Sequence, residues 1–274
     1  MTHHNPYVRL THWLLPVMAL LALAMGGCKD FDPDVDNMQH QITSKPFLAV
    51  ATYMPEGTSG YYFILDGSTV IRALNATERL FGADEQRCFV SYHEIGSSYD
   101  YVGASGANAG KINIIEAHVN YVNSIYTKLP LEIDAAAADS LTSSSPLSIR
   151  WEWPTLIQDG YLTIYFNSDS GRVNLNGLRL LAGADADHPE VLVLHYDPEA
   201  TPAVYDDTNP VIAFNLNGLD TLTDDSYLTL RWTSPDGPTD RQIALHLRGG
   251  SVSRGGESDI SPWIFSSEQL SDLY

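Results

Sequence analysis

The sequence predicts an all-β protein, with a small OB-type barrel followed by an antiparallel β-sandwich. Three observations predict this fold class. Short runs of β-forming residues recur along the chain, turn-forming Gly, Pro, Asp and Asn residues separate them, and no strong amphipathic helix interrupts them. The 274 residues are 44% hydrophobic and 10% aromatic, which is enough apolar material for about two domains with real cores.

We expect residues 46–133 to form the barrel. An Asp66-Gly67 pair between two β-rich runs is a hairpin signal. The run from 111 to 125 alternates apolar and polar residues, although a helix over 115–126 is the competing prediction. Five or so strands in about 85 residues suit a small barrel. The runs are 47–53, 61–65, 69–72, 88–92 and 111–125.

The second half, residues 145–248, is expected to form the sandwich. The segments Asp134–Asp139 and Ser143–Pro146 mark the boundary between the halves. Strand-like runs then resume at a spacing typical of a sandwich. The tail, residues 249–274, is rich in Gly and Ser until the apolar segment Pro262–Phe265, which we expect to pack onto a domain. The runs are 147–153, 160–166, 172–181, 191–196, 211–216, 227–233 and 241–247.

The N-terminus, residues 1–27, has the layout of a cleaved secretory signal. Arg9 precedes an unbroken run of 13 apolar residues, Trp13–Met25, which is shorter than the roughly 20 needed to span a membrane. The sequence Ala24-Met25-Gly26-Gly27-Cys28 then resembles a bacterial lipobox, with Met in place of the usual Leu. We therefore predict that Cys28 carries the lipid, for example palmitate. The alternative is an ordinary signal peptide with a cysteine beside its cleavage site.

The residues after Cys28 form a short acidic tether, residues 28–45. Its start, with Lys29, Asp30 and Asp32, resembles the export signal that places Bacteroidetes lipoproteins on the outer face of the outer membrane. A solvated tether is the alternative interpretation, because charged linkers extend by self-repulsion. We predict that the protein is held in the outer membrane by its lipid anchor and faces the cell exterior.

The charge balance excludes one class of partner. The chain has 15 Lys and Arg residues against 34 Asp and Glu residues, a formal charge of −19. Nucleic acid binding needs a basic face for the phosphates, so nucleic acid is not an expected partner. A surface protein or a glycan is the expected kind of partner instead.

No catalytic residue and no cofactor is predicted. The sequence has no metalloprotease helix motif, nucleophile elbow, phosphate-binding loop or dinucleotide fingerprint. Cys88 lies among strand-forming residues and is expected to be a buried core residue. Asp185, Asp187 and His188 are the densest group of metal ligands, but a solvated acidic turn is the favoured interpretation, so no metal site is predicted.

Aromatic residues supply weak candidates for a binding surface. Trp151, Trp153, Tyr161 and Tyr165 alternate in two neighbouring runs, where they would either stack on sugar rings or a partner, or fill the sandwich core. The core is the favoured interpretation. A second candidate group is Tyr53, Tyr61, Tyr62, Tyr99 and Tyr101.

Two short motifs resemble the O-glycosylation signal of Bacteroidetes envelopes. They place Ser140 between Asp139 and Leu141, and Thr221 between Asp220 and Leu222. Motifs of this length arise often by chance. Ser140 is favoured because it lies in the predicted linker between the domains.

The order of lipobox, tether, barrel and sandwich resembles the NigD-like lipoproteins of Bacteroidetes. The resemblance covers residues 46–248, and the longer 98–110 loop and the tail depart from the family pattern. It implies this two-domain fold and, through the bacteriocin-associated operon that names the family, an immunity or envelope function without catalytic residues. The residues that carry it are Tyr61–Gly67, Gln86–Tyr92, Lys111–Lys128, Ile149 with Trp151, and Asp159–Phe166.

Three functions are compatible with the sequence. The favoured one is a non-enzymatic cell-surface binding or adhesion module, because two β-domains and a lipid anchor come without a catalytic signature. The alternative is a bacteriocin-immunity or envelope-protective lipoprotein. The third is a surface glycan hydrolase, which would need a carboxylate pair that spacing alone does not identify.

Overall fold

The computed structural model describes residues 45–248 with short gaps, together with Phe265 and Ser266. The gaps are 67, 83, 103–109, 142–143, 152–154, 168–171, 207–209, 221 and 223–226. The predicted signal peptide and nearly all of the tether, including Cys28, Lys29, Asp30 and Asp32, lie outside the described residues. Within the part that is described, no helix is long and apolar enough to cross a membrane.

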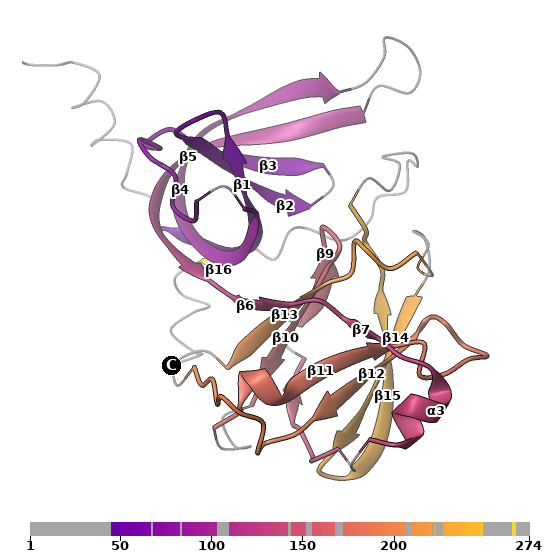
Figure 1. The fold of residues 1–274 in the computed structure, drawn as a ribbon. Helices are drawn as coiled ribbons and strands as arrows, with labels where there is room; N and C mark the ends of the chain where they lie inside the picture. Colours follow the sequence, from indigo (N-terminus) through magenta and orange to yellow (C-terminus); the bar gives the residue numbers. More distant parts are fainter. Residues whose placement is uncertain are drawn as a thin grey trace, which may run out of the picture. The chain divides into compact units, whose positions relative to one another are not determined.

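Five strands of the first half close into a barrel (Figure 1). Their order is β1-β2-β3-β5-β4 and back to β1; β3 and β5 run parallel, and the other neighbours run antiparallel. This order is that of a small Greek-key barrel of the OB type. The predicted fold class is therefore confirmed here. The strands are β1 (Phe47–Glu56), β2 (Gly60–Asp66), β3 (Thr69–Ala73), β4 (Gln86–Val102) and β5 (Gly110–Ser124).

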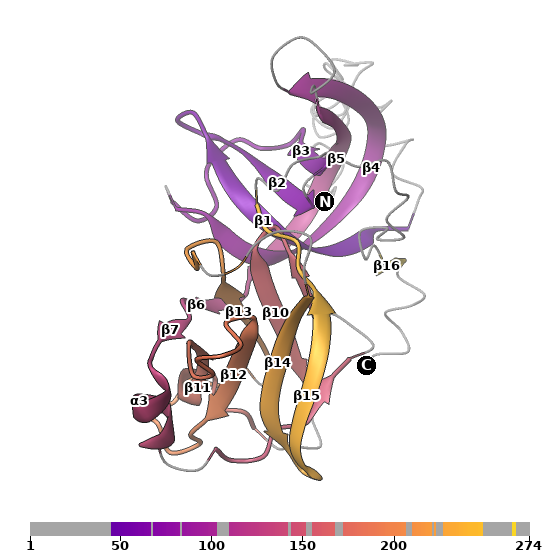
Figure 2. The same ribbon diagram turned by 90° about the vertical axis from the view of Figure 1, so that its right-hand side faces the viewer.

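The two longest strands, β4 and β5, pair with each other along their length and curve together (Figure 2). Their register shifts between Ser91 and Tyr92 and between Glu94 and Gly96. β5 is a strand throughout, so the competing helix over 115–126 is wrong. β5 forms a strand because its backbone hydrogen-bonds to β3 on one edge and to β4 on the other. In addition, its residues Ile115, Ala117 and Val119 face the barrel core at the spacing of a strand.

The barrel core confirms the interpretation of Cys88. Its side chain is fully buried, and its Sγ lies 3.5 Å from the carbonyl oxygen of Ala51. Burial raises the pKa of the thiol to about 12, so it stays protonated. Around it lie the inward-facing residues of all five strands, among them Ala49, Tyr53 and Phe63.

The second half forms two more sheets around one core, as predicted for a sandwich. Both sheets contribute buried side chains to it, for example Phe166 and Phe214 from one and Leu194 and Leu230 from the other. The first sheet has β6 (Tyr126–Lys128), β13 (Val211–Asn215), β10 (Tyr161–Phe166), β8 (Ile149–Arg150) and β9 (Leu156–Gln158); the second has β15 (Gly237–Ala244), β14 (Tyr227–Ser234), β12 (Val191–Tyr196), β11 (Leu178–Ala182) and β7 (Leu131–Glu132).

The sandwich departs from the prediction in its details. Three pairings are parallel, namely β6 with β13, β7 with β11 and β12 with β14. β6 and β7 precede residue 133 in the sequence, yet they pair with sandwich strands, so the chain crosses from one β-structure to the other directly after β5. The domain limits themselves stay a prediction.

Short elements complete the described chain. The linker contains a helix, α3 (Ala135–Asp139), which Asp134 caps by accepting a 2.7 Å hydrogen bond from the Ala137 amide. A single 3-10 turn, η3 (Leu175–Gly177), leads into β11. From the tail, β16 (Phe265–Ser266) pairs with the start of β1, which places this end of the predicted apolar segment against the barrel.

β1 is buried on both faces. Its inward residues line the barrel core, while Leu48 and Val50 on its outward face pack with Tyr161, Val211 and Ala213 of the sandwich. A strand that is covered on both faces has a nearly continuous apolar sequence, and Phe47–Tyr53 is such a sequence. β1 is therefore part of the barrel wall and also the surface with which the barrel contacts the sandwich.

The β9–β10 hairpin turns at Asp159 and Gly160, two residues with φ of 51° and 72°. A two-residue turn with positive φ at both positions is the type I′ turn that Asp-Gly favours. The Gly160 amide donates to His246 O at 2.8 Å, and its carbonyl accepts from the Leu216 amide at 2.8 Å. A Cβ at Gly160 would lie 1.8 Å from Asn217 Oδ1, so glycine is required for space as well as for conformation.

We expect Gly160→Ala to destabilise the protein more than Gly57→Ala, by at least about 1 kcal/mol in the free energy of unfolding measured with urea. Both glycines have positive φ, but a Cβ at Gly57 meets nothing within 4 Å. Asn217 can move away from the new methyl group only by giving up its bonds to Asp159 O and the Arg248 amide. Equal losses in the two variants would show that the turn tolerates the extra atom.

Candidate functional site

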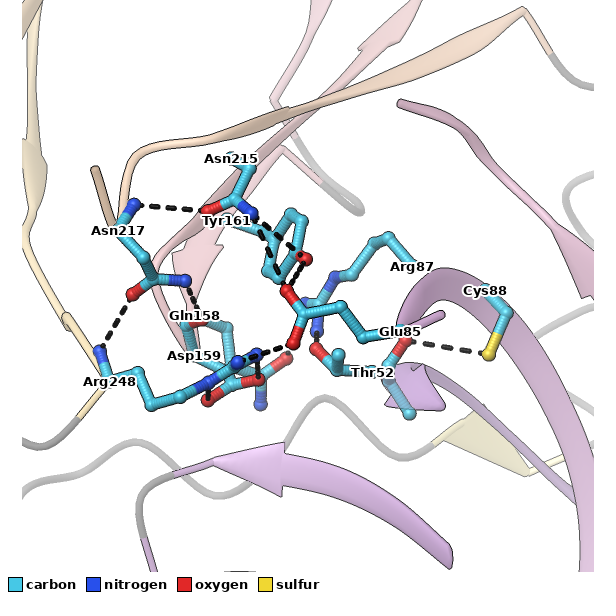
Figure 3. Close-up of polar contacts among 11 residues, drawn as sticks. Thr52, Glu85, Arg87, Cys88, Gln158, Asp159, Tyr161, Asn215, Asn217 and Arg248 are labelled. Atoms are coloured by element: carbon cyan, nitrogen blue, oxygen red, sulfur yellow. Dashed lines mark hydrogen bonds and ion pairs between the residues drawn. The ribbon is translucent and has the colours of Figure 1, made fainter. Parts of the chain in front are cut away.

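A polar cluster connects the barrel to the sandwich (Figure 3). We call it the Arg248 cluster, after the side chain at its centre. The barrel supplies residues from β1 and from the start of β4, and the sandwich supplies residues from the β9–β10 hairpin, β13 and the segment after β15. The members are Thr52, Glu85, Arg87, Gln158, Asp159, Tyr161, Asn215, Asn217 and Arg248.

The Arg248 guanidinium lies between two carboxylates. Its Nε and Nη2 donate to the two oxygens of Asp159 at 2.9 and 2.6 Å, and its Nη1 donates to Glu85 Oε2 at 2.5 Å. A two-bond arginine–carboxylate pair is both strong and geometrically specific. The Asp159 side chain is 2% exposed, so the guanidinium takes the place of solvent around its carboxylate. The hydrogen bond to Asp159 is the main cause of the raised pKa of Arg248.

Glu85 joins the same cluster through its second oxygen. Oε1 accepts a short hydrogen bond from the Tyr161 hydroxyl and a longer one, 3.4 Å, from Asn215 Nδ2. Burial on its own would raise the pKa of Glu85, but the bonds from Tyr161 and Arg248 and the charge of Arg248 lower it overall. Burial and the bond to Glu85 raise the pKa of Tyr161. The pair is thus a carboxylate and a neutral phenol.

Arg87 is a fully buried cation beside this network. It donates to Thr52 Oγ1 at 3.0 Å and to Gln158 Oε1 at 3.1 Å, and its guanidinium lies 5.6 Å from the centre of the Tyr161 ring. Burial lowers its pKa to about 10, although the charge of Asp159 opposes this effect. The two arginines and two carboxylates balance in charge, which offsets the cost of burying Arg87 and Asp159, whereas Glu85 and Arg248 are only half-buried.

This arrangement is suited to holding the two β-structures together. Glu85 and Asp159 are neighbouring carboxylates, as a glycosidase pair would be, but both are bound to the same guanidinium. The lowered pKa of Glu85 keeps this carboxylate ionised, which disfavours it as a general acid at neutral pH. We therefore assign the Arg248 cluster a structural role.

A groove on the barrel is the second candidate. We call it the β5 groove; it has a volume of about 380 Å³. Buried Tyr61 and Val119 lie at its base, and Leu80 and Tyr121, which are 42% and 50% exposed, stand at its rim. The lining residues are Tyr61, Asn75, Thr77, Glu78, Leu80, Phe81, Val119, Asn120, Tyr121 and Val122.

The loop from β3 to β4 forms one wall of the β5 groove and is fastened to the barrel. The Leu74 amide donates to Ala117 O at 2.9 Å. The Asn75 side chain then pairs with Val119 as a strand residue would, donating to its carbonyl and accepting from its amide, both at 2.9 Å. Further along, Arg79 donates to the Gly57 carbonyl. These bonds form the groove without help from a ligand.

Aromatic rings support the base of the β5 groove. The Tyr53 ring lies 5.4 Å from Tyr61 and 5.2 Å from Phe81, measured between centroids, and both of those rings line the groove. Phe63 packs edge-on against Tyr61 at 5.5 Å. The Tyr53 hydroxyl is buried and has no hydrogen-bond partner among the described residues. Burial, with the neighbouring Tyr53, raises the pKa of Tyr61.

Comparison with known proteins adds a likeness of fold. No protein-family model and no curated protein matches the sequence. Among solved structures, the chain is similar to a NigD-like immunity protein from Bacteroides caccae. The two are 13% identical with a TM-score of 0.38, and the match covers 73% of this chain and 91% of the other. That is the family the sequence resembles.

Two further solved structures are similar. A protein described as toxin-related from Parabacteroides distasonis is 23% identical, with a TM-score of 0.48 over 72% of this chain and 92% of its own. A protein described as a lipoprotein from Bacteroides fragilis is 10% identical, with a TM-score of 0.46 over 74% and 98%. At TM-scores below 0.5, these likenesses carry no argument about function.

The predicted aromatic group does not form one surface. Tyr161 is buried, but it packs with Leu48 and Val50 of the barrel and not in the sandwich core that was favoured for it, and its ring lies near Arg87 and Arg248. Trp151 is half-buried against the sandwich core, with Arg241 stacked 4.0 Å from its ring centre. Tyr165 is half-buried beside Arg150. Trp153 lies outside the described residues.

The second aromatic group is also divided. Tyr53 and Tyr61 belong to the barrel core, and Tyr61 also lines the β5 groove. Tyr62 is half-buried on β2. The side chains of Tyr99 and Tyr101 lie outside what the structure describes.

The weak metal candidates are not gathered together. Asp185 pairs with Arg231 at 3.3 Å, and His188 Nδ1 lies 3.3 Å from Glu190, while Asp187 is exposed. Among the described residues, no three or more His, Cys, Asp or Glu side chains form a group that could hold a metal ion. Of the glycosylation candidates, Ser140 is exposed at the end of α3, and Thr221 lies outside the described residues.

Sequence reasoning named one member of each site, Tyr161 for the Arg248 cluster and Tyr61 for the β5 groove, and missed the other members. For the Arg248 cluster, further signals were a charged residue inside a β-rich run, at Arg87, and the Asp159-Gly160 turn.

The other residues of the β5 groove gave no signal, since Asn75, Leu80 and Tyr121 are ordinary surface residue types. Only the closure of the barrel brings the loop from β3 to β4 against the end of β5.

We expect Arg248→Met to lower the free energy of unfolding by on the order of 3 kcal/mol, because it leaves Glu85 and the buried Asp159 without their cation. Arg231→Met is the matched control. Arg231 pairs with Asp185 and Asp240 on an exposed face, where ion pairs contribute less than about 1 kcal/mol. Urea unfolding of both variants measures these free energies. Similar losses of stability in the two variants would contradict the central role of Arg248.

Proposed function

We propose that the protein is a lipid-anchored, non-enzymatic binding module on the outer face of the outer membrane. The lipobox at Cys28 and the acidic start of the tether support the anchor and the location. The acidity of the chain, at −19, supports a surface that faces solvent and does not bind nucleic acid. The binding role depends on the barrel.

The β5 groove is the observation that carries the binding role. It is concave, its base is made of packed rings, and its rim carries amide, hydroxyl and carboxylate groups. Because Asn75 and Arg79 fix its wall, little ordering is needed when a ligand binds. A preformed site of this kind on a rigid β-scaffold is typical of binding proteins.

A bacteriocin-immunity or protective role is the alternative that the resemblance implies, and it stays a prediction. Unchanged bacteriocin sensitivity after deletion of the gene would remove it. A surface glycan hydrolase is the least favoured, because Arg248 neutralises the neighbouring carboxylates Glu85 and Asp159.

The two cysteines of the chain give a direct test of the anchor. We expect Cys28→Ala to abolish incorporation of labelled palmitate and to release the protein from the membrane fraction. Cys88→Ala should leave both unchanged, because Cys88 is buried in the barrel core. A Cys28→Ala protein that stays acylated and membrane-bound would contradict the lipoprotein assignment.

The binding role can be tested with the unacylated mature chain, residues 28–274 carrying Cys28→Ala, labelled and applied to fixed cells of the producing bacterium. We expect Tyr121→Ala to reduce retention about tenfold, since tyrosine is among the residue types that most often carry the binding energy of a contact. Tyr227→Ala is the control, because Tyr227 is also an exposed tyrosine, at 61% against 50% for Tyr121, and lies on β14 and not in the groove. Equal retention of both variants, or none with the parent chain, would contradict the proposal.

A further inference from the structure

The chemistry of the β5 groove indicates its ligand. Resting on the binding function proposed above, we propose that the groove binds a short segment of a neutral oligosaccharide. Its volume, about 380 Å³, is at the low end of the range for small-molecule sites, which run from roughly 300 to 1,000 Å³. Three properties of the groove carry the inference.

The first property is the combination of rings and amides. Tyr121 and Leu80 offer apolar faces at the rim, and Tyr61 and Phe81 continue them below. Thr77 and Glu78 add groups that donate and accept hydrogen bonds between these faces. Asn120 adds its amide oxygen and the amide hydrogen that is not donated to Ser91 Oγ at 3.3 Å. A sugar ring has the matching surface, since its C–H groups are apolar and its hydroxyls both donate and accept.

The second property is charge. Glu78 is the one charged residue among those that line the groove. The nearby Arg79 donates to the Gly57 carbonyl and does not line it. On a chain with a net charge of −19, this favours a neutral ligand over uronic acids, sialic acids or phosphorylated groups.

The third property concerns the backbone of β5. An extended peptide would bind by adding a strand, which requires free amide and carbonyl groups on the edge of β5. At Val119 both groups are already bonded to the Asn75 side chain, and at Ala117 the carbonyl accepts from Leu74. At the point where a peptide strand would begin to pair, the groove therefore offers a ligand side chains and not free backbone groups.

The test uses the same unacylated mature chain on an array of neutral gluco-, manno-, galacto- and xylo-oligosaccharides, with sialylated and uronic acid-containing glycans beside them. Titration calorimetry with the best neutral ligand then compares the parent chain with Tyr121→Ala, Asn120→Ala and the control Tyr227→Ala. We expect binding to neutral glycans, weakened at least about tenfold by the two groove variants and unchanged by the control. Urea unfolding verifies that all variants are folded.

The outcomes separate this inference from the proposed function. Binding of acidic glycans alone, or neutral binding that ignores Tyr121 and Asn120, overturns the inference. If fixed cells retain the protein through Tyr121 but lose this ability on protease treatment and keep it after periodate oxidation, the ligand is a protein. The binding function then stands and the oligosaccharide assignment fails. If neither glycans nor cells are bound, both fail.

Discussion

The Arg248 guanidinium, shared between Glu85 and Asp159, is the interaction on which the joined structure depends. Without it, Asp159 would be a buried charge in a tight turn, and the turn positions Tyr161 and Gln158 against the barrel. The network also sets the chemistry of the cluster. Both carboxylates are committed to one cation, so the charges that sequence reasoning left open for catalysis are used to hold the fold.

The second constraint is the burial of β1 on two faces. The same ten residues close the barrel and cover β10 and β13 of the sandwich. The apolar contact and the polar Arg248 cluster lie side by side, since Thr52 follows Val50 on the outward face of β1. Apolar burial stabilises this contact, and the charged hydrogen bonds of the polar network add geometric specificity.

Local patterns in the sequence predicted most of the strands, whereas the pairing of the short strands and the partners of the polar side chains depend on long-range contacts. The Asp66-Gly67 pair predicted the β2–β3 hairpin, and alternation at Ile112, Ile114 and Val119 favoured a strand for β5, because those signals lie within a few residues. Alternation alone left a helix over 115–126 open. The parallel pairings of β6 and β7 were not predictable, since two or three residues carry no period. The partners of Arg248 and Asn75 lie 163, 89 and 44 residues away, and no spacing rule connects them.

Asn75 protects a strand edge of the barrel from pairing with other molecules. An open strand edge templates pairing between chains and is a recognised route to aggregation. By occupying both backbone groups of Val119, a single amide side chain closes the edge of β5 where β3 ends. The proposed lipid anchor would confine many copies to two dimensions, at a local concentration far above that in solution, and neighbouring copies would meet side chains at this edge.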